Sequence, residues 1–401
     1  MLLLDSESEA QFRKEIRAWV RQAVPQLGGP PPERDWQARR RYDSAWQRML
    51  ADAGYAGIHW PREYGGRGAS PAEHLIFLEE SAAAGAPDLG VHFVGQLHAG
   101  PTLIAEATDE QRAFHLPRIL SGEAVWCQGF SEPGAGSDLA GLRTRAVRDG
   151  DHYVVTGQKI WTSYGPVADY CELLVRTDPD APKHRGITWL IMPMDSPGVD
   201  VRPLRTIHGD SEFAEVYLDE VRIPVANRVG AENDGWRVAM VTFGFERGTA
   251  FVRELITART HVADLAALAR VLPRGAGTAW DDTGLRRDIG RVAAELDALW
   301  ALTKRNVTRG MVGVIPPAGG SAFKLSYSET LHHLSALIIR VLDRAALSMD
   351  DLPALPGKPG LPTGQLVHAQ LHAFAISIGA GTSQIQRNIL AERVLGLPKE
   401  R

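Results

Sequence analysis

The stretch GFSEPGAGSDLAG, residues 129–141, is the most informative part of the chain. Its small residues allow the backbone to approach a ligand closely, and its hydroxyl and amide groups can form hydrogen bonds. It lacks the lysine of a phosphate-binding loop and the glycine spacing of a dinucleotide-binding turn. From composition alone a surface turn explains it equally well, so its meaning depends on the rest of the chain.

Two further segments have an unusual composition. In QKIWTSYG, residues 158–165, a tryptophan beside hydroxyl groups can form a wall for a planar aromatic ring, although the indole can equally be a core side chain. In GAGTSQIQRN, residues 379–388, small residues precede Thr and Gln at an expected helix start. That pattern suits binding of an anion or a carbonyl by backbone N–H groups, and it is also a good helix cap.

Hydrophobic periodicity divides the chain around these segments. Up to about residue 120 apolar residues recur at helical spacing, and the patterns beginning at Ser6, Ser70 and Thr108 predict helix starts. From residue 123 short β-rich runs follow, such as 170–175 and 187–192, without the βαβ alternation of a Rossmann fold. The helical pattern then returns. The prediction is an α+β multidomain chain: an N-terminal helical domain (1–122), a middle antiparallel β domain (123–232) and a C-terminal four-helix-bundle domain (233–401).

Composition excludes several classes of function. The 401 residues carry a net charge of −4, which gives no reason to expect nucleic acid or an anionic membrane as a partner. The two cysteines, Cys127 and Cys171, lack the spacing of a metal site, so no metal is expected. Both are expected to be reduced, which favours a cytoplasmic protein. The sequence predicts no signal peptide and no membrane anchor.

Taken together and in this order, the three segments resemble the acyl-CoA dehydrogenase family. GIHWP at 57–61 and VRIP at 221–224 extend the resemblance over essentially the whole chain. It implies the same order of helical, β and bundle domains, with FAD as the cofactor and an acyl-CoA as the substrate. It also implies an electron-transfer flavoprotein as the electron acceptor, and assembly as a homo-oligomer or as a heteromer with a related chain.

The resemblance also assigns roles to individual residues. Phe130 and Ser131 would line the flavin ring, Trp161 would stack near it, and Ser163 would offer its hydroxyl to the N5 edge. Ser137 would lie near the acyl-CoA. The residues implied to bind the cofactor are Gln128, Phe130, Ser131, Trp161, Ser163, Thr382 and Gln384.

The catalytic base is the main departure from the common pattern. Many relatives carry a glutamate directly before the GTS string, where this chain has Ala380. The backbone N–H of Ala380 can still donate to the thioester carbonyl, because that donor does not depend on the side chain. A second branch of the family places the base on the first bundle helix, expected here over 234–270. Glu246 is therefore the candidate base and the adjacent Arg247 a candidate substrate-binding residue, although a solvated glutamate is the plainer interpretation.

Other functions remain open at this point. The chain can act on a thioester tethered to a carrier protein, or pass electrons to oxygen as an oxidase or monooxygenase. It can also be a non-catalytic FAD-binding subunit of a mixed complex, which the presence of Ser131, Trp161, Ser163 and Glu246 argues against. The sequence does not identify the acyl group.

Overall fold

The protein is described by a computed structural model covering residues 5–32, 34–249, 251–311, 319–354 and 360–399. Side chains are described for these residues except those at 245–249, 309–311 and 319. The chain forms two compact units, which we call the sheet unit (Ala10–Ala250) and the bundle unit (Met1–Glu9 and Phe251–Arg401).

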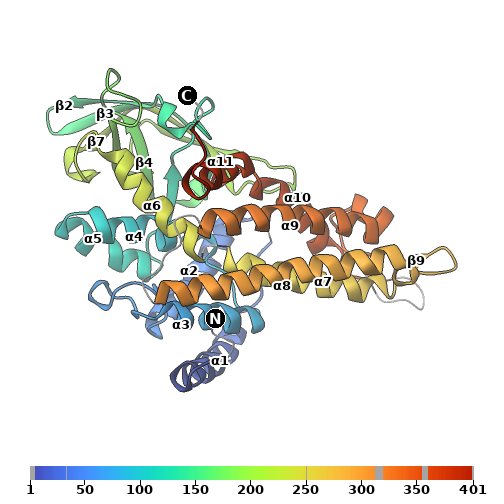
Figure 1. The fold of residues 1–401 in the computed structure, drawn as a ribbon. Coiled ribbons are helices and arrows are strands. Elements are labelled where there is room, and N and C mark those ends of the chain that lie inside the picture. Colours follow the sequence, from blue (N-terminus) through green and yellow to red (C-terminus); the bar gives the residue numbers. More distant parts are fainter. Residues whose placement is uncertain (1–4, 33, 250, 312–318, 355–359, 400–401) are drawn as a thin grey trace. The chain divides into compact units, whose positions relative to one another are not determined.

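Helices dominate the chain up to residue 120 (Figure 1). The expected starts are confirmed: Ser6 and Glu9 bond reciprocally, and so do Ser70 with Glu73 and Thr108 with Gln111. Each pair satisfies donors that have no partner within the first helical turn. The helical elements are α1 (Glu7–Leu27), α2 (Trp36–Asp52), η1 (Arg62–Tyr64), α3 (Pro71–Ala83), η2 (Gly90–His92), the π-helical η3 (Gly95–Ala99), α4 (Gly100–Glu106) and α5 (Asp109–Leu120).

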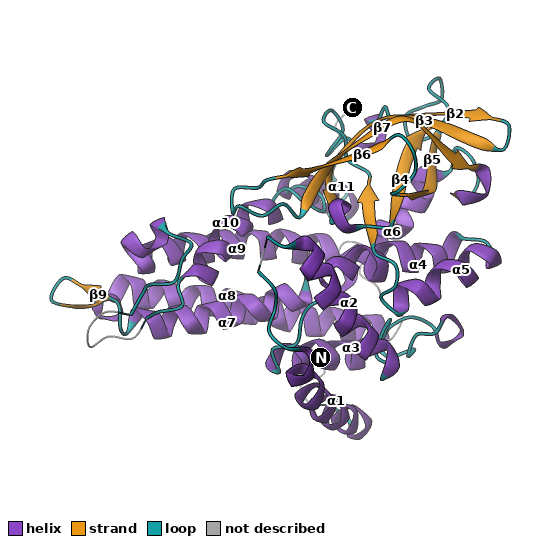
Figure 2. Cartoon of the chain, turned by 180° about the vertical axis from the view of Figure 1, so that it is seen from behind, coloured by secondary structure: helices purple, strands orange, loops and turns teal. Residues whose placement is uncertain are grey.

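The β-rich region folds into one sheet of eight strands, coloured orange in Figure 2. Its path is β6-β7-β3-β2-β4-β5-β8, and β1 pairs with β4. Most pairs are antiparallel as expected, but β4 pairs in parallel with both β1 and β2, so the sheet is mixed. The strands are β1 (Trp126–Gly129), β2 (Arg145–Asp149), β3 (His152–Ser163), β4 (Tyr170–Arg176), β5 (Ile187–Pro193), β6 (Val199–Leu204), β7 (Phe213–Pro224) and β8 (Arg228–Val229).

Two apolar cores cover the sheet. One contains Trp126, Leu174 and Trp189 together with side chains from the N-terminal helices, and the other lies among the strands around Tyr153 and Met192. All five side chains are fully buried, each 0% exposed. Burial on both sides explains why β4 and β5 read as nearly continuous apolar runs.

The predicted helix over 234–270 is wrong in one respect, because the structure has two helices there. They are α6 (Gly235–Thr249), which belongs to the sheet unit, and α7 (Val252–Ala269), which begins the bundle unit. Phe251 has φ −99° and ψ 10°, outside regular helical geometry. Glu246 therefore lies on a helix that packs with the sheet unit.

The bundle unit contains the long helices α7, α8 (Thr283–Met311) and α9 (Gly319–Leu342), which run side by side in both views (Figures 1 and 2). The shorter helices α10 (Gly364–Ile376) and α11 (Ser383–Arg393) contact α9. The return of helices after the β-rich region, predicted from the sequence, is confirmed, and α9 is followed by the 3₁₀ segment η8 (Asp343–Leu347). A short hairpin of β9 (Pro273–Arg274) and β10 (Gly277–Thr278) follows α7. In the described part of the chain, no helix has the length and apolar character to span a bilayer.

Candidate functional site

The glycine-rich loop and the end of β3 are bonded to one another. The backbone N–H of Ile160 donates to the Ser131 carbonyl at 3.0 Å. This bond brings Phe130 and Ser131 beside Trp161, although about 30 residues of sequence separate them. The structure thus unites two of the three segments that the sequence singled out.

A buried ion pair holds the glycine-rich loop in place. Lys159 is 0% exposed, and its Nζ donates to Glu132 Oε1 at 2.8 Å and to the Phe130 carbonyl at 3.1 Å. Glu132 also accepts backbone N–H bonds from Arg143 and Thr144. Burial lowers the pKa of Lys159 and by itself would raise the pKa of Glu132. The attraction to Lys159 and the added hydrogen bonds outweigh burial and lower the pKa of Glu132 instead.

Trp161 sits in a β-bulge that turns its indole out of the sheet. The register between β3 and β7 shifts between Lys159 and Thr162, and Trp161 has φ 60°, in the left-handed region. A bulky residue in that region costs about 1–3 kcal/mol, yet the side chain remains 53% exposed. The centres of the Trp161 and Phe213 rings are 5.9 Å apart, in an edge-to-face arrangement. The backbone therefore presents a large aromatic face that the protein core does not use.

Two hydroxyl groups flank this indole. Ser131 and Ser163 are half-buried, and within the described residues neither hydroxyl has a hydrogen-bond partner. A planar apolar face bordered by free donors fits an isoalloxazine ring, which needs stacking surface and hydrogen bonds at its edge. The residues present thus fit the cofactor that the family resemblance implies.

Gln128 is held by a polar network inside the sheet unit. Its Nε2 lies 2.9 Å from Glu172 Oε1 and 3.2 Å from His98 Nδ1. Glu172 is 0% exposed, and its strand neighbour is Gln128 itself. These buried polar contacts fix the residue just before the glycine-rich loop.

The helix that carries Glu246 contacts the same region. Phe243 meets the Phe130 ring edge to face at 5.9 Å, and the Thr242 and Thr102 hydroxyls are 2.8 Å apart. A Cβ added at Gly244 would meet nothing within 4 Å. The Glu246 and Arg247 backbones are helical, but their side chains lie outside the described residues.

Ser137 is exposed on the glycine-rich loop, as are its neighbours Gly136 and Asp138. The Asp138 carboxylate pairs with Lys183 at 2.8 Å, and both of these side chains are more than half exposed. The position is accessible to a substrate, and no described residue forms a hydrogen bond with the Ser137 side chain.

The third segment forms a strained turn in the bundle unit. Ala380 has φ 53° and Gly381 φ 82°, so two consecutive residues are left-handed. For an alanine this conformation costs about 1–2 kcal/mol. Thr382 then caps α11 by accepting the Ile385 N–H at 3.2 Å, and Gln384 is exposed on the first turn of that helix.

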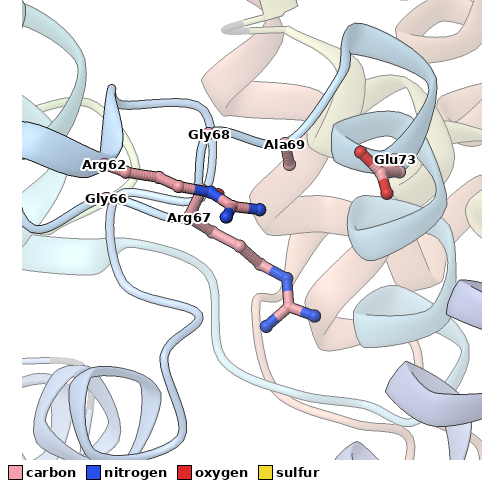
Figure 3. Close-up of a pocket in the computed structure, with 6 residues that line it drawn as sticks. All are labelled: Arg62, Gly66, Arg67, Gly68, Ala69 and Glu73. Atoms are coloured by element: carbon pink, nitrogen blue, oxygen red, sulfur yellow. The ribbon is translucent and has the colours of Figure 1, made fainter.

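The sheet unit also contains a pocket that none of the predicted site residues lines. It has a volume of about 460 Å³ and lies between the η1 turn and the start of α3. Figure 3 shows the Arg62 and Arg67 side chains crossing it and Glu73 on the helix. Arg62 Nε donates to the Arg67 carbonyl, and the Arg67 guanidinium lies 4.9 Å from the centre of the Tyr55 ring. This pocket is distinct from the segments described above.

Sequence reasoning missed the residues that hold the site segments in place. They are polar side chains buried among apolar ones. A charged residue within an otherwise apolar strand, such as Glu172 in β4, is the sequence signal that could have identified them. Their partners are distant in sequence and could not be read from local patterns. The missed residues are His98, Glu132, Lys159, Glu172, Lys324 and Gln386.

The fold and these segments define the class of protein. The chain belongs to the acyl-CoA dehydrogenase family, whose members are flavin-dependent oxidoreductases. Models of the acyl-CoA dehydrogenase N-terminal, middle and C-terminal domains match residues 6–123, 127–221 and 233–395. The matches confirm the family and the order of helical, β and helical regions predicted from the sequence.

Individual relatives resemble the chain over its full length. It is 40% identical to acyl-CoA dehydrogenase IpdE1 of Mycobacterium tuberculosis, over 97% of this chain and 98% of that one. The crystal structure of the ChsE4-ChsE5 complex from Mycobacterium tuberculosis matches with a TM-score of 0.82 and 34% identity over 100% of both chains. The Tcur3481-Tcur3483 steroid ACAD matches with a TM-score of 0.81 and 33% identity over 100% of both chains.

Proposed function

We propose that the chain catalyses the FAD-dependent α,β-dehydrogenation of an acyl-CoA thioester to the trans-2-enoyl-CoA. The observation that carries this proposal is the aromatic face of Trp161, held in a strained bulge near the hydroxyls of Ser131 and Ser163, which have no hydrogen-bond partner among the described residues. When bound, FAD would supply a hydride acceptor at N5 for the β-hydrogen. Phe130, Gln128, Thr382 and Gln384 would complete its binding site.

In this proposal Glu246 is the base that removes the α-proton. The proton moves to its carboxylate as the Cα=Cβ bond forms and the β-hydrogen leaves with its electron pair. Phe243, which lies three residues before Glu246 on the same face of α6, meets the Phe130 ring, and this contact supports a base at this part of the helix. Arg247 and Ser137 are proposed to bind the substrate.

Ala380 would polarise the thioester carbonyl through its backbone N–H. Its N–H donates to no acceptor within the part of the chain that the structure describes. A donor held in advance toward a developing enolate oxygen lowers the barrier to α-proton removal, because it needs no rearrangement during the reaction. In this proposal the donor to the carbonyl is Ala380 and the base is a different residue, Glu246.

Substitution of Glu246 by Gln tests this assignment. We expect the variant to keep its FAD, seen as an unchanged ratio of absorbance at about 450 to 280 nm, and to lose rapid flavin bleaching on anaerobic mixing with acyl-CoA. The control is Glu63→Gln, which neutralises an exposed carboxylate on the η1 turn. Reduction of the Glu246→Gln flavin at the wild-type rate would remove Glu246 from the mechanism.

The substrate panel should include short, long, branched and ring-bearing acyl-CoAs. The name of the related steroid ACAD motivates the ring-bearing members, including steroid-derived ones. We also propose that the protein works as an oligomer, either with copies of itself or with a related chain, as the ChsE4-ChsE5 complex does. An electron-transfer flavoprotein is the proposed acceptor, and slow reoxidation of the reduced protein in air is the expected result.

A further inference from the structure

The turn that carries Ala380 is tied down at several points. Gln386 Nε2 lies 3.0 Å from the Ala380 carbonyl oxygen and 3.2 Å from that of Gly381. Lys324 Nζ donates to the same Gly381 oxygen at 2.8 Å. Gln386 and Lys324 are 1% and 2% exposed, so neither bond competes with bulk water.

Gln386 is an unusual choice for a buried position if stability alone selected it. Two carbonyls face its amide, and only the NH₂ end of an amide side chain can donate to a carbonyl, so its partners fix the amide orientation. The remaining oxygen, Oε1, is buried with no hydrogen-bond partner in the described residues. Leaving a buried acceptor unpaired disfavours folding, and such exceptions are found where a group serves function.

The bonds set the direction of one N–H group. On one side, the Gly379 N–H donates to the Ala375 carbonyl at 2.8 Å. On the other side, the Ala380 carbonyl accepts from Gln386. With both flanking groups fixed and Ala380 at φ 53°, the Ala380 N–H has one orientation and no acceptor among the described residues.

Gly381 belongs to the same arrangement. Its φ of 82° suits glycine, and a Cβ there would lie 2.7 Å from Gln386 Nε2. Any larger residue would therefore displace the amide that holds the turn. The glycine is required by the Gln386 contact as well as by its own backbone conformation.

We propose that Gln386, assisted by Lys324, is a positioning residue for the substrate carbonyl. It holds the Ala380 turn so that the Ala380 N–H donates to the thioester oxygen of a bound acyl-CoA. This inference rests on the proposed function, because it assigns the residues that orient one donor of that same reaction. Neither Gln386 nor Lys324 touches the substrate in this scheme.

The test uses the full-length, FAD-loaded protein, together with its partner chain if it is isolated with one. Gln386→Met keeps the length of the side chain and removes both N–H donors, and Lys324→Met removes the second anchor. Gln370→Met is the matched control, since Gln370 is a buried glutamine of α10 in the same unit, 7% exposed. The probe is the enoyl-CoA product of whichever panel substrate bleaches the wild-type flavin, labelled with ¹³C at C1.

Two measurements separate positioning from a structural role. In the Gln386→Met protein we expect the limiting rate of flavin reduction to fall about 10–100-fold, the size expected for misplacement of a transition-state donor. The carbonyl stretch of the bound enoyl-CoA, read by Raman difference spectroscopy, should move toward its frequency in water. FAD content and thermal stability should match wild type, because the substitution also removes the unpaired oxygen. Lys324→Met should shift the band in the same direction, and Gln370→Met should leave it unchanged.

The other outcomes overturn the inference in distinguishable ways. A wild-type carbonyl frequency in the Gln386→Met protein, or loss of FAD from it, would show that Gln386 does not orient the carbonyl donor. If Gln386→Met does not fold, a wild-type carbonyl frequency in Lys324→Met overturns the inference by itself. Failure of every acyl-CoA to bleach the wild-type flavin would instead refute the proposed function, and the inference with it.

Discussion

Replacing Lys159 by Met is the sharpest test of how the site is built. The side chain is 0% exposed and its removal leaves the Glu132 carboxylate, whose side chain is 8% exposed, without its counter-charge. Breaking a buried ion pair by deleting one partner costs about 3–5 kcal/mol. Glu132 keeps two backbone N–H donors, from Arg143 and Thr144, so we expect the lower end, about 3 kcal/mol.

Thermal unfolding of the FAD-free protein measures this effect. For a unit of this size a loss of about 3 kcal/mol corresponds to a fall in Tm of about 6–12 °C. The Phe130 carbonyl also loses its donor, so the loop should shift and FAD should bind about tenfold more weakly, by titration of the FAD-free protein. Lys183→Met is the matched control, because the Lys183–Asp138 pair is 55% and 66% exposed. The control should change stability by less than about 1 kcal/mol.

A double variant separates charge from packing. Adding Glu132→Gln to Lys159→Met removes the uncompensated carboxylate while keeping an oxygen for the two backbone donors. We expect at least half of the lost stability to return, because the penalty comes mainly from a buried unpaired charge. Equal Tm values for Lys159→Met and Lys183→Met, or no recovery in the double variant, would refute this reasoning.

Two further predictions concern the base and the response to acid. Adding Ala380→Glu to Glu246→Gln should restore part of the flavin bleaching, since φ 53° is already occupied by a residue with a Cβ; no recovery would leave the relocated base unsupported. Burial lowers the pKa of His59 to about 4 and that of His74 to about 3, from 6.5, and their rings stack at 4.9 Å. The unfolded chain binds these protons first, so stability is complete above about pH 6.5 and falls below it, by about 2 kcal/mol per histidine between pH 7.5 and 5. Denaturant unfolding of His74→Phe at both pH values should show a pH dependence smaller by that amount, and an unchanged dependence would contradict the assignment.

Local features of the fold were predictable from the sequence. The helix starts at Ser6, Ser70 and Thr108 were correct because each depends on bonds within four residues. The β-rich runs were correct because strands that are buried on both faces of a sheet consist mostly of apolar residues. The domain borders at 122 and 232 stay a prediction.

The supports of the site could not be predicted, because their partners are far apart in the chain. Lys159 and Glu132 are 27 residues apart, Gln128 and Glu172 are 44 apart, and Lys324 bonds to a residue 57 positions later. Nothing in local spacing selects one such pair over another. The helix break near Phe251 was missed for a related reason, since the apolar pattern continues through it and the break follows from a change of packing partner.

Residues that disfavour folding occur in the segments that the resemblance assigns to chemistry. Trp161 and Ala380 are both left-handed although neither is glycine, and the buried Gln386 Oε1 has no hydrogen-bond partner in the described parts of the chain. At each position another residue would destabilise the folded state less: glycine at the first two positions and an apolar side chain at the third. A sequence selected for stability alone would use those residues. Their absence implies selection for what the strained groups present, namely an exposed indole face in one segment and an N–H donor of fixed direction in the other.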